Sequence, residues 1–117
     1  MQKLVIACLF AFACETYHAG QLYGEGTRAL DRGATAVAIE ALEQAGELAP
    51  HASEIQNHLG LAYAAAGRDF EARAAFERAV VLDCDNSAAV HNLAGAQAKA
   101  VVEVTEVGGN DRLVEDH

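Results

Sequence analysis

The strongest constraint on how this chain folds is an internal repeat with a fixed period. Six small or apolar positions recur in one register: Gly26, Gly33, Ala38, Leu42, Ala45 and Pro50 are followed, at a constant spacing, by Gly60, Gly67, Ala72, Phe76, Ala79 and Cys84. A fixed period of this length is typical of arrays of one supersecondary unit, in which no unit buries its apolar face alone. Because alanine, the strongest helix former, is also the most frequent residue, we expect the repeated unit to be helical.

The pattern resembles the tetratricopeptide repeat (TPR), a pair of antiparallel helices that recurs with a period of about 34 residues. The match is fullest over residues 53–86, where Leu59, Gly60 and Tyr63 stand at first-helix positions, Ala72, Phe76 and Ala79 at second-helix positions, and Cys84 replaces the terminal proline. The unit before it departs from the pattern at Glu25 and Ala29, and a third unit begins at Ser87 and then loses it. The resemblance implies an all-α fold, in which antiparallel helix pairs stack as a short right-handed solenoid of about two repeats and a capping helix.

Local signals place the ends of the helices. Ser53 with Gln56 is a capping-box pattern, Gly67 suits a left-handed helix end, and Asp69 is placed to cap the following helix. We therefore expect helices at 16–32, 35–48, 53–66, 69–82 and 87–103. The chain is expected to divide into a signal peptide at 1–13, a linker at 14–18, a first repeat at 19–52, a second at 53–86, a capping helix or partial repeat at 87–107 and a flexible tail at 108–117.

Residues 1–14 differ in character from the rest of the chain. Lys3 is followed by an uncharged apolar run over 4–13, which ends in the small residues around Phe12, and Cys14 comes next. This order is typical of a secretory signal cleaved after Ala13, and the run is shorter than the ~20 residues that span a bilayer as a helix. The sequence therefore predicts an exported protein.

The junction Ala11-Phe12-Ala13-Cys14 also resembles the lipobox of bacterial lipoproteins. The resemblance implies acylation of Cys14 and anchoring in the cell envelope, although Ala11 and Phe12 stand where the lipobox usually has Leu and a small residue. Cleavage without lipidation, giving a periplasmic protein, is the alternative. In a third reading the first helix is part of the core of a cytoplasmic protein.

Charge and motifs argue against several function classes. With 8 Lys and Arg against 17 Asp and Glu, the net charge is -9, which disfavours binding to nucleic acid. His58 and His91 lack the further ligands that a zinc site needs, and the acidic residues Asp83 and Asp85 beside Cys84 argue against a nucleophilic role for its thiol. The sequence carries no phosphate-binding loop or triad order, so we expect no enzyme activity, no metal and no cofactor.

The resemblance implies a protein or peptide partner, bound on the concave surface that the first helices of the repeats form. Carried over to this chain, the groove positions are Tyr23, Thr27, Asp31, Glu54, Asn57, Leu61, His91 and Lys99. The positions of the carboxylate clamp found in some co-chaperones hold Tyr23, Thr27, His58, Ala88 and Asn92, which does not support that specialised function. The acidic chain favours a basic or neutral ligand.

An alternative from another class is a structural assembly subunit or spacer that self-associates through its capping helix. The two functions differ in what they require of the groove. A binding module is expected to expose Tyr23, Asn57, Leu61 and His91, whereas an assembly subunit is expected to bury them against a second copy.

Overall fold

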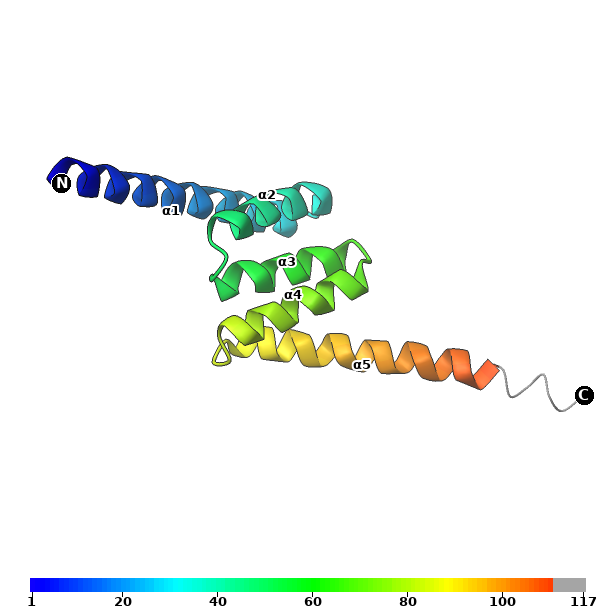
Figure 1. Cartoon of the computed structure of the whole chain (residues 1–117). Coiled ribbons are helices and arrows are strands. Elements are labelled where there is room, and N and C mark those ends of the chain that lie inside the picture. Colours follow the sequence, from blue (N-terminus) through cyan, green and yellow to red (C-terminus); the bar gives the residue numbers. More distant parts are fainter. Residues whose placement is uncertain (111–117) are drawn as a thin grey trace, which may run out of the picture.

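A computed structural model of the chain describes the backbone of residues 1–110 and the side chains of residues 1–106. Its helices are α1 (Gln2–Asp31), α2 (Thr35–Leu48), α3 (Ser53–Ala65), α4 (Asp69–Leu82) and α5 (Ser87–Asn110). Helices α1 and α2 form one antiparallel pair and α3 and α4 a second, and the pairs stack through α2 and α3 (Figure 1). Helix α5 lies against α4 and, less extensively, against α3. The predicted all-α fold of paired helices is confirmed.

Each helix pair is held together where a glycine of the first helix meets a large side chain of the second. A side chain at Gly26 would clash with Leu42, which is fully buried, and a side chain at Gly60 would clash with the ring of Phe76. Small residues recur at these positions because the two helix backbones approach closely there. The period in the sequence is therefore a period in helix packing.

The turns inside the two pairs are also equivalent. Gly33 and Gly67 have φ angles of 78° and 75°, in the left-handed region that favours glycine. At the second turn the Arg68 amide donates to the Tyr63 carbonyl over 2.8 Å, and the Ala34 amide makes the matching 2.9 Å bond at the first turn. The expected end at Gly67 is confirmed, and α2 and α4 have the predicted bounds.

The predicted caps of α3 and α4 are wrong. The N-cap residue of α3 is Ala52, and Ser53 is instead buried, where its hydroxyl donates to the Ala79 carbonyl over 2.8 Å and accepts from the Asn86 amide over 2.9 Å. The N-cap residue of α4 is Arg68, one position before Asp69. Both side chains bind partners that are distant in the sequence instead of the nearby backbone amides: Ser53 as described, and Asp69 through a hydrogen bond from Lys99 of α5.

Two expected boundaries also differ from the structure. The segment 14–18, expected to be a linker, is helical within α1, and the hydroxyl of Thr16 donates back to the Phe12 carbonyl over 2.8 Å. Helix α5 continues through the expected end at 103 and through the two glycines to Asn110. Valine and glycine lower helix stability by only ~0.5–1 kcal/mol per residue, so neither feature alone ends a helix. The expected tail at 111–117 lies outside the described residues.

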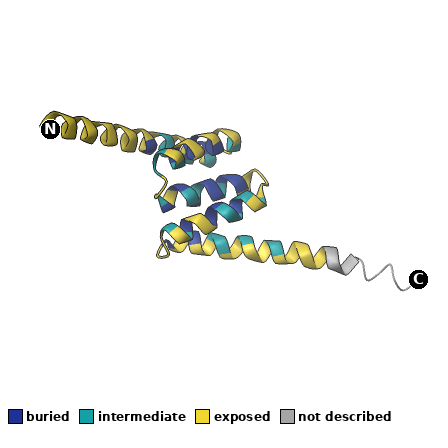
Figure 2. Cartoon of the chain, viewed as in Figure 1, coloured by how far each residue is buried: buried dark blue, intermediate teal, exposed yellow. Residues whose placement is uncertain are grey.

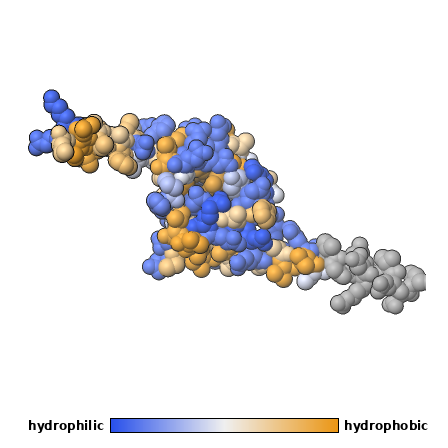
Figure 3. Space-filling view, viewed as in Figure 1, coloured by the Kyte–Doolittle hydropathy of each residue, from blue (hydrophilic) through white to orange (hydrophobic). Residues whose placement is uncertain are grey.

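Helices α1 and α5 project from the stack toward opposite sides, and the molecule measures 81 × 28 × 21 Å along its principal axes (Figure 1). Burial is concentrated where the helices overlap, whereas α1 is exposed from Gln2 to His18 (Figure 2). Much of that exposed part is apolar, with Leu4 71% and Phe10 73% exposed (Figure 3). Among the described residues, no helix combines the length and the apolar character needed to cross a bilayer.

Candidate functional site

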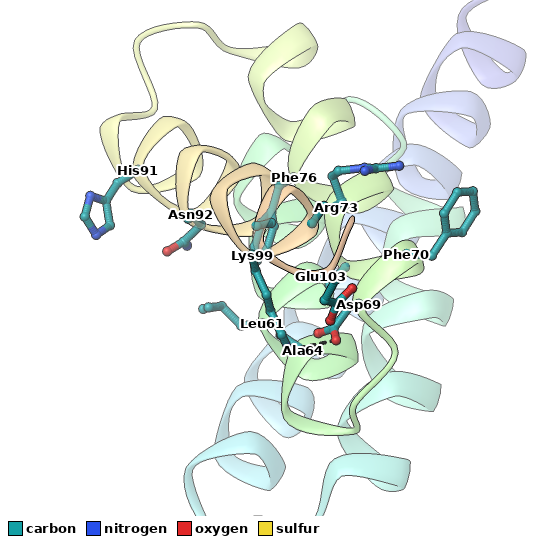
Figure 4. A pocket seen from close by; sticks show the side chains of 14 residues that line it. Leu61, Ala64, Asp69, Phe70, Arg73, Phe76, His91, Asn92, Lys99 and Glu103 are labelled. Carbon is teal, nitrogen blue, oxygen red and sulfur yellow. Dashed lines mark hydrogen bonds and ion pairs between the residues drawn. The ribbon is translucent and has the colours of Figure 1, made fainter. Parts of the chain in front are cut away.

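A hollow of about 450 Å³ opens between α3, the first half of α4 and α5. Its apolar part is formed by Leu61 and Ala64 from α3, Phe76 from α4, and Gly95 and Ala96 from α5. Polar side chains surround this part, namely Asp69, Arg73, His91, Asn92, Lys99 and Glu103 (Figure 4). An apolar centre with a polar rim is the usual composition of a site that binds a side chain of another molecule.

Gly95 keeps the hollow open on the α5 side. A Cβ atom placed on Gly95 would meet no other atom within 4 Å, so the space above its backbone is empty. Gly95 lies one repeat period after Leu61, and the two residues therefore occupy equivalent positions in successive first helices. The groove predicted from the sequence included Leu61 but not Gly95. Adding one repeat period to the position of Leu61 would have identified Gly95.

The rim of the hollow carries a balanced set of charges. Lys99 Nζ lies 2.7 Å from Asp69 Oδ2, and both side chains are partly exposed. The hydrogen bond to Asp69 raises the pKa of Lys99, and Glu103 one turn further along α5 acts in the same direction. Arg73 lies 3.8 Å from Glu77 on the outer side of α4. The rim therefore attracts neither cations nor anions strongly by itself.

Asn57 is buried, contrary to the exposure expected from the sequence. Its side chain is only 3% exposed, and its Oδ1 accepts a 2.9 Å hydrogen bond from Nδ2 of Asn92. This bond joins α3 to α5 behind the hollow. Asn57 thus positions Asn92, which lies on the rim itself.

The predicted groove residues divide into two groups in the structure. Leu61, His91 and Lys99 line the hollow, although His91 points away from the other labelled side chains (Figure 4). The other predicted residues lie outside the hollow. They are Asn57, described above, and Tyr23, Thr27, Asp31 and Glu54, on α1 and at the start of α3. The structure therefore does not gather all the expected positions into one continuous site.

Tyr23 and His58 form a separate contact between α1 and α3. The Tyr23 hydroxyl lies 3.2 Å from His58 Nδ1, and the two rings pack edge to face with centroids 5.2 Å apart. Burial, together with the charge of Glu54, raises the pKa of Tyr23. Thr27 is half-buried and donates to the Gly24 carbonyl of its own helix, whereas Asp31 is exposed at the end of α1.

These arrangements are suited to non-covalent binding. Within the described residues, no three His, Cys, Asp or Glu side chains lie close enough together to hold a metal ion. Cys84, exposed in the turn between α4 and α5, stands at the position that proline usually takes in this repeat.

Comparison with known proteins assigns part of the chain to a repeat family. Residues 53–86, which comprise α3, α4 and the turn that follows, match the tetratricopeptide repeat family. None of the curated proteins is similar enough to count as a relative of the chain. A repeat of this kind is typically non-catalytic and suggests a protein partner. Helices α3 and α4 thus form a tetratricopeptide repeat, placed between the helix pair α1–α2 and the single helix α5.

Proposed function

We propose that this chain is a non-catalytic protein-interaction module, which binds a segment of a partner protein in the hollow between α3 and α5. The observation that carries the proposal is the open apolar surface formed by Leu61 and Gly95. Other large apolar side chains of α3, such as Ile55 and Leu59, are buried by packing within the chain. The hollow is large enough to accept an apolar side chain of a ligand.

Charge favours a ligand that also carries Lys or Arg. The rim is balanced, but the chain as a whole has a net charge of -9, and the exposed carboxylates of Asp31 and Glu54 lie on the neighbouring first helices. Such charges speed the encounter with a cationic segment and are screened beyond ~8–10 Å at physiological ionic strength. Binding is therefore expected to weaken as salt is added.

The experiment compares partner capture by the wild type, Gly95→Leu and Leu61→Glu at low and high salt. Gly95→Leu places an apolar side chain in the hollow, and nothing lies within 4 Å of its Cβ position. Ala98→Leu is the matched control, since Ala98 is exposed on α5 and does not line the hollow. We expect both groove variants to lose the partners that the wild type and the control retain, with unchanged circular dichroism.

Identical sets of captured proteins for all four chains would contradict groove binding. In that case a structural assembly subunit would become the better explanation of the fold. Loss of capture in Ala98→Leu alone would place the binding surface on the outer side of α5.

For the cellular setting, we propose export to a bacterial envelope, with residues 1–13 acting as a signal peptide and Cys14 as the acylated residue. The uncharged run over 4–13 and the small residues before Cys14 support this proposal. The exposure of this run is also consistent with it, because none of the described residues buries Leu4, Phe10 or Phe12. The sulfur-bearing side chain of Cys14 is likewise exposed.

A further inference from the structure

Helix α5 carries an exposed seam on the side that faces neither the stack nor the hollow. The seam consists of Val90, Ala94, Gln97, Val101 and Val104, which are separated by four, three, four and three residues. All five side chains are exposed, with Val101 63% and Val104 73% accessible. A 4-3-4-3 spacing of mainly apolar residues is the pattern of a helix that packs along another helix. A second hollow, of about 380 Å³, runs beside the seam.

The equivalent face of the two preceding first helices is covered. Ala94 lies one repeat period after Gly60 and two periods after Gly26, which are buried beneath α4 and α2 respectively. At Gly33 and Gly67 the chain turns back to make those covering helices, but at the equivalent Val101 it continues as helix. Within residues 1–110, α5 therefore has no second helix packed on this face.

The residue at position 94 restricts what can cover the seam. A Cβ at Gly26 or Gly60 would clash with Leu42 or Phe76, whereas Ala94 already carries a Cβ. A covering helix with a large side chain at this point would be held away from α5. The seam is suited to a helix that presents a smaller residue there, such as valine.

We propose that the seam binds α5 of a second copy of this chain, antiparallel, about a two-fold axis through Gln97. In this register Val90 packs against Val104 of the other copy, and Ala94 packs against Val101 of the other copy. The two Gln97 side chains meet at the axis, where each amide can both donate and accept a hydrogen bond. Val90 and Val104 lie seven residues to either side of Gln97, and Ala94 and Val101 lie three and four residues from it, so the seam is nearly symmetric about the proposed two-fold axis.

The distribution of charge favours a second copy at this surface. Two chains of net charge -9 repel each other, but residues 87–102 contain no Asp or Glu. The α5 residues beside the seam, Leu93, Ala98 and Ala100, are also uncharged, and Arg73 of α4 lines the second hollow next to it. Lys99 turns instead toward Asp69 on the other side of α5. Approach along the seam therefore avoids the carboxylates that oppose association elsewhere.

The seam and the binding hollow lie on different sides of α5, so this inference does not rest on the proposed function. From Val90 to Val104 the seam is about 21 Å long, at 1.5 Å per residue. It includes the part of α5 that projects beyond the stack (Figure 1). In the proposed dimer the projecting end of each helix lies along the packed end of the other.

Analytical ultracentrifugation of the full chain over a wide concentration range is the first test. We expect a monomer–dimer equilibrium, and we expect Val101→Glu to raise its dissociation constant at least about 100-fold, because each copy would bury an unpaired charge against Ala94 of the other. Val37→Glu, at an exposed valine of α2, is the matched control and should leave the equilibrium unchanged. A wild-type chain that stays monomeric would overturn the proposal, as would a dimer that Val101→Glu does not weaken.

Cross-linking then tests the orientation, in a chain whose exposed Cys8, Cys14 and Cys84 are replaced by serine. Gln97→Cys is expected to form a disulfide-linked dimer on mild oxidation. A mixture of Val90→Cys and Val104→Cys chains is expected to cross-link to each other, and each alone is not. Efficient cross-linking of Val90→Cys with itself would show a parallel pair and overturn the two-fold arrangement. Gly95→Leu, which blocks the hollow, should leave all these cross-links intact.

Discussion

At the scale of single residues, Phe76 connects the repeat pattern to stability. Its ring fills the space that Gly60 leaves between α3 and α4, and only 3% of it is exposed. Phe76→Ala is therefore expected to cost ~3–5 kcal/mol, which is a large part of the ~5–15 kcal/mol that stabilises a domain of this size. Thermal melts followed by circular dichroism should show a much lower Tm than the wild type. The exposed control Glu103→Ala should melt with the wild type, and equal Tm values for the two variants would contradict the assigned packing.

Tyr63 makes stability depend on pH in the alkaline range. Its hydroxyl donates to a Glu43 carboxylate oxygen, and burial followed by this bond and the Glu43 charge raises the pKa of Tyr63 from 10.0 to about 12. Because the folded state holds the proton more tightly, this contribution is complete below pH ~10 and is lost as the pH rises toward ~12. Urea unfolding at several pH values should show the loss. In Tyr63→Phe the fall over this range should be smaller, and an unchanged slope would exclude Tyr63 as its source.

At the scale of helices, glycine has opposite effects at two positions. Gly67 ends α3 with φ 75°, whereas Gly20 lies exposed inside α1 with no atom within 4 Å of a Cβ position. Gly67→Ala is expected to destabilise the chain by ~1–2 kcal/mol, since L residues are strained in the left-handed region. Gly20→Ala should stabilise α1 by ~0.5–1 kcal/mol. Chemical denaturation measures both, and a shift of the same sign for the two variants would contradict the assigned backbone at Gly67.

At the scale of the whole molecule, the first part of α1 is a long exposed apolar surface on which no other helix of the described residues packs. If it is a lipoprotein signal, as proposed above, the mature protein in a bacterial host begins at Cys14 and carries the mass of added acyl chains. Intact-mass spectrometry of membrane and soluble fractions should find this species in the membrane fraction. Cys14→Ala should abolish acylation and release the protein while leaving its circular dichroism unchanged. Finding residues 1–13 still attached in the membrane-bound protein would contradict the lipoprotein proposal.

The sequence by itself determined the features that depend on local periodicity. The period that relates Gly26 to Gly60 reappears in the structure as two equivalent helix contacts, and Gly67 predicted the end of α3, because tolerance of a positive φ is a property of glycine itself. The bounds of α2 and α4 followed for the same reason. The position of Leu61 in the repeat likewise defines the face of α3 on which it lies, and in the structure Leu61 lines the hollow.

Only the tertiary structure decided what polar side chains do, because their partners lie far away in the sequence. Asn57 looked like a groove residue, but Asn92, on the next first helix, turns it into a buried link between α3 and α5. Ser53 looked like a helix cap, but the carbonyl of Ala79 and the amide of Asn86 hold it in the core. The shape of the hollow depends in the same way on where α5 packs, and no local pattern predicts an opening between two helices. A hydrogen-bonding group takes the best partner that folding brings to it, and the pattern of neighbours along the chain does not contain that choice.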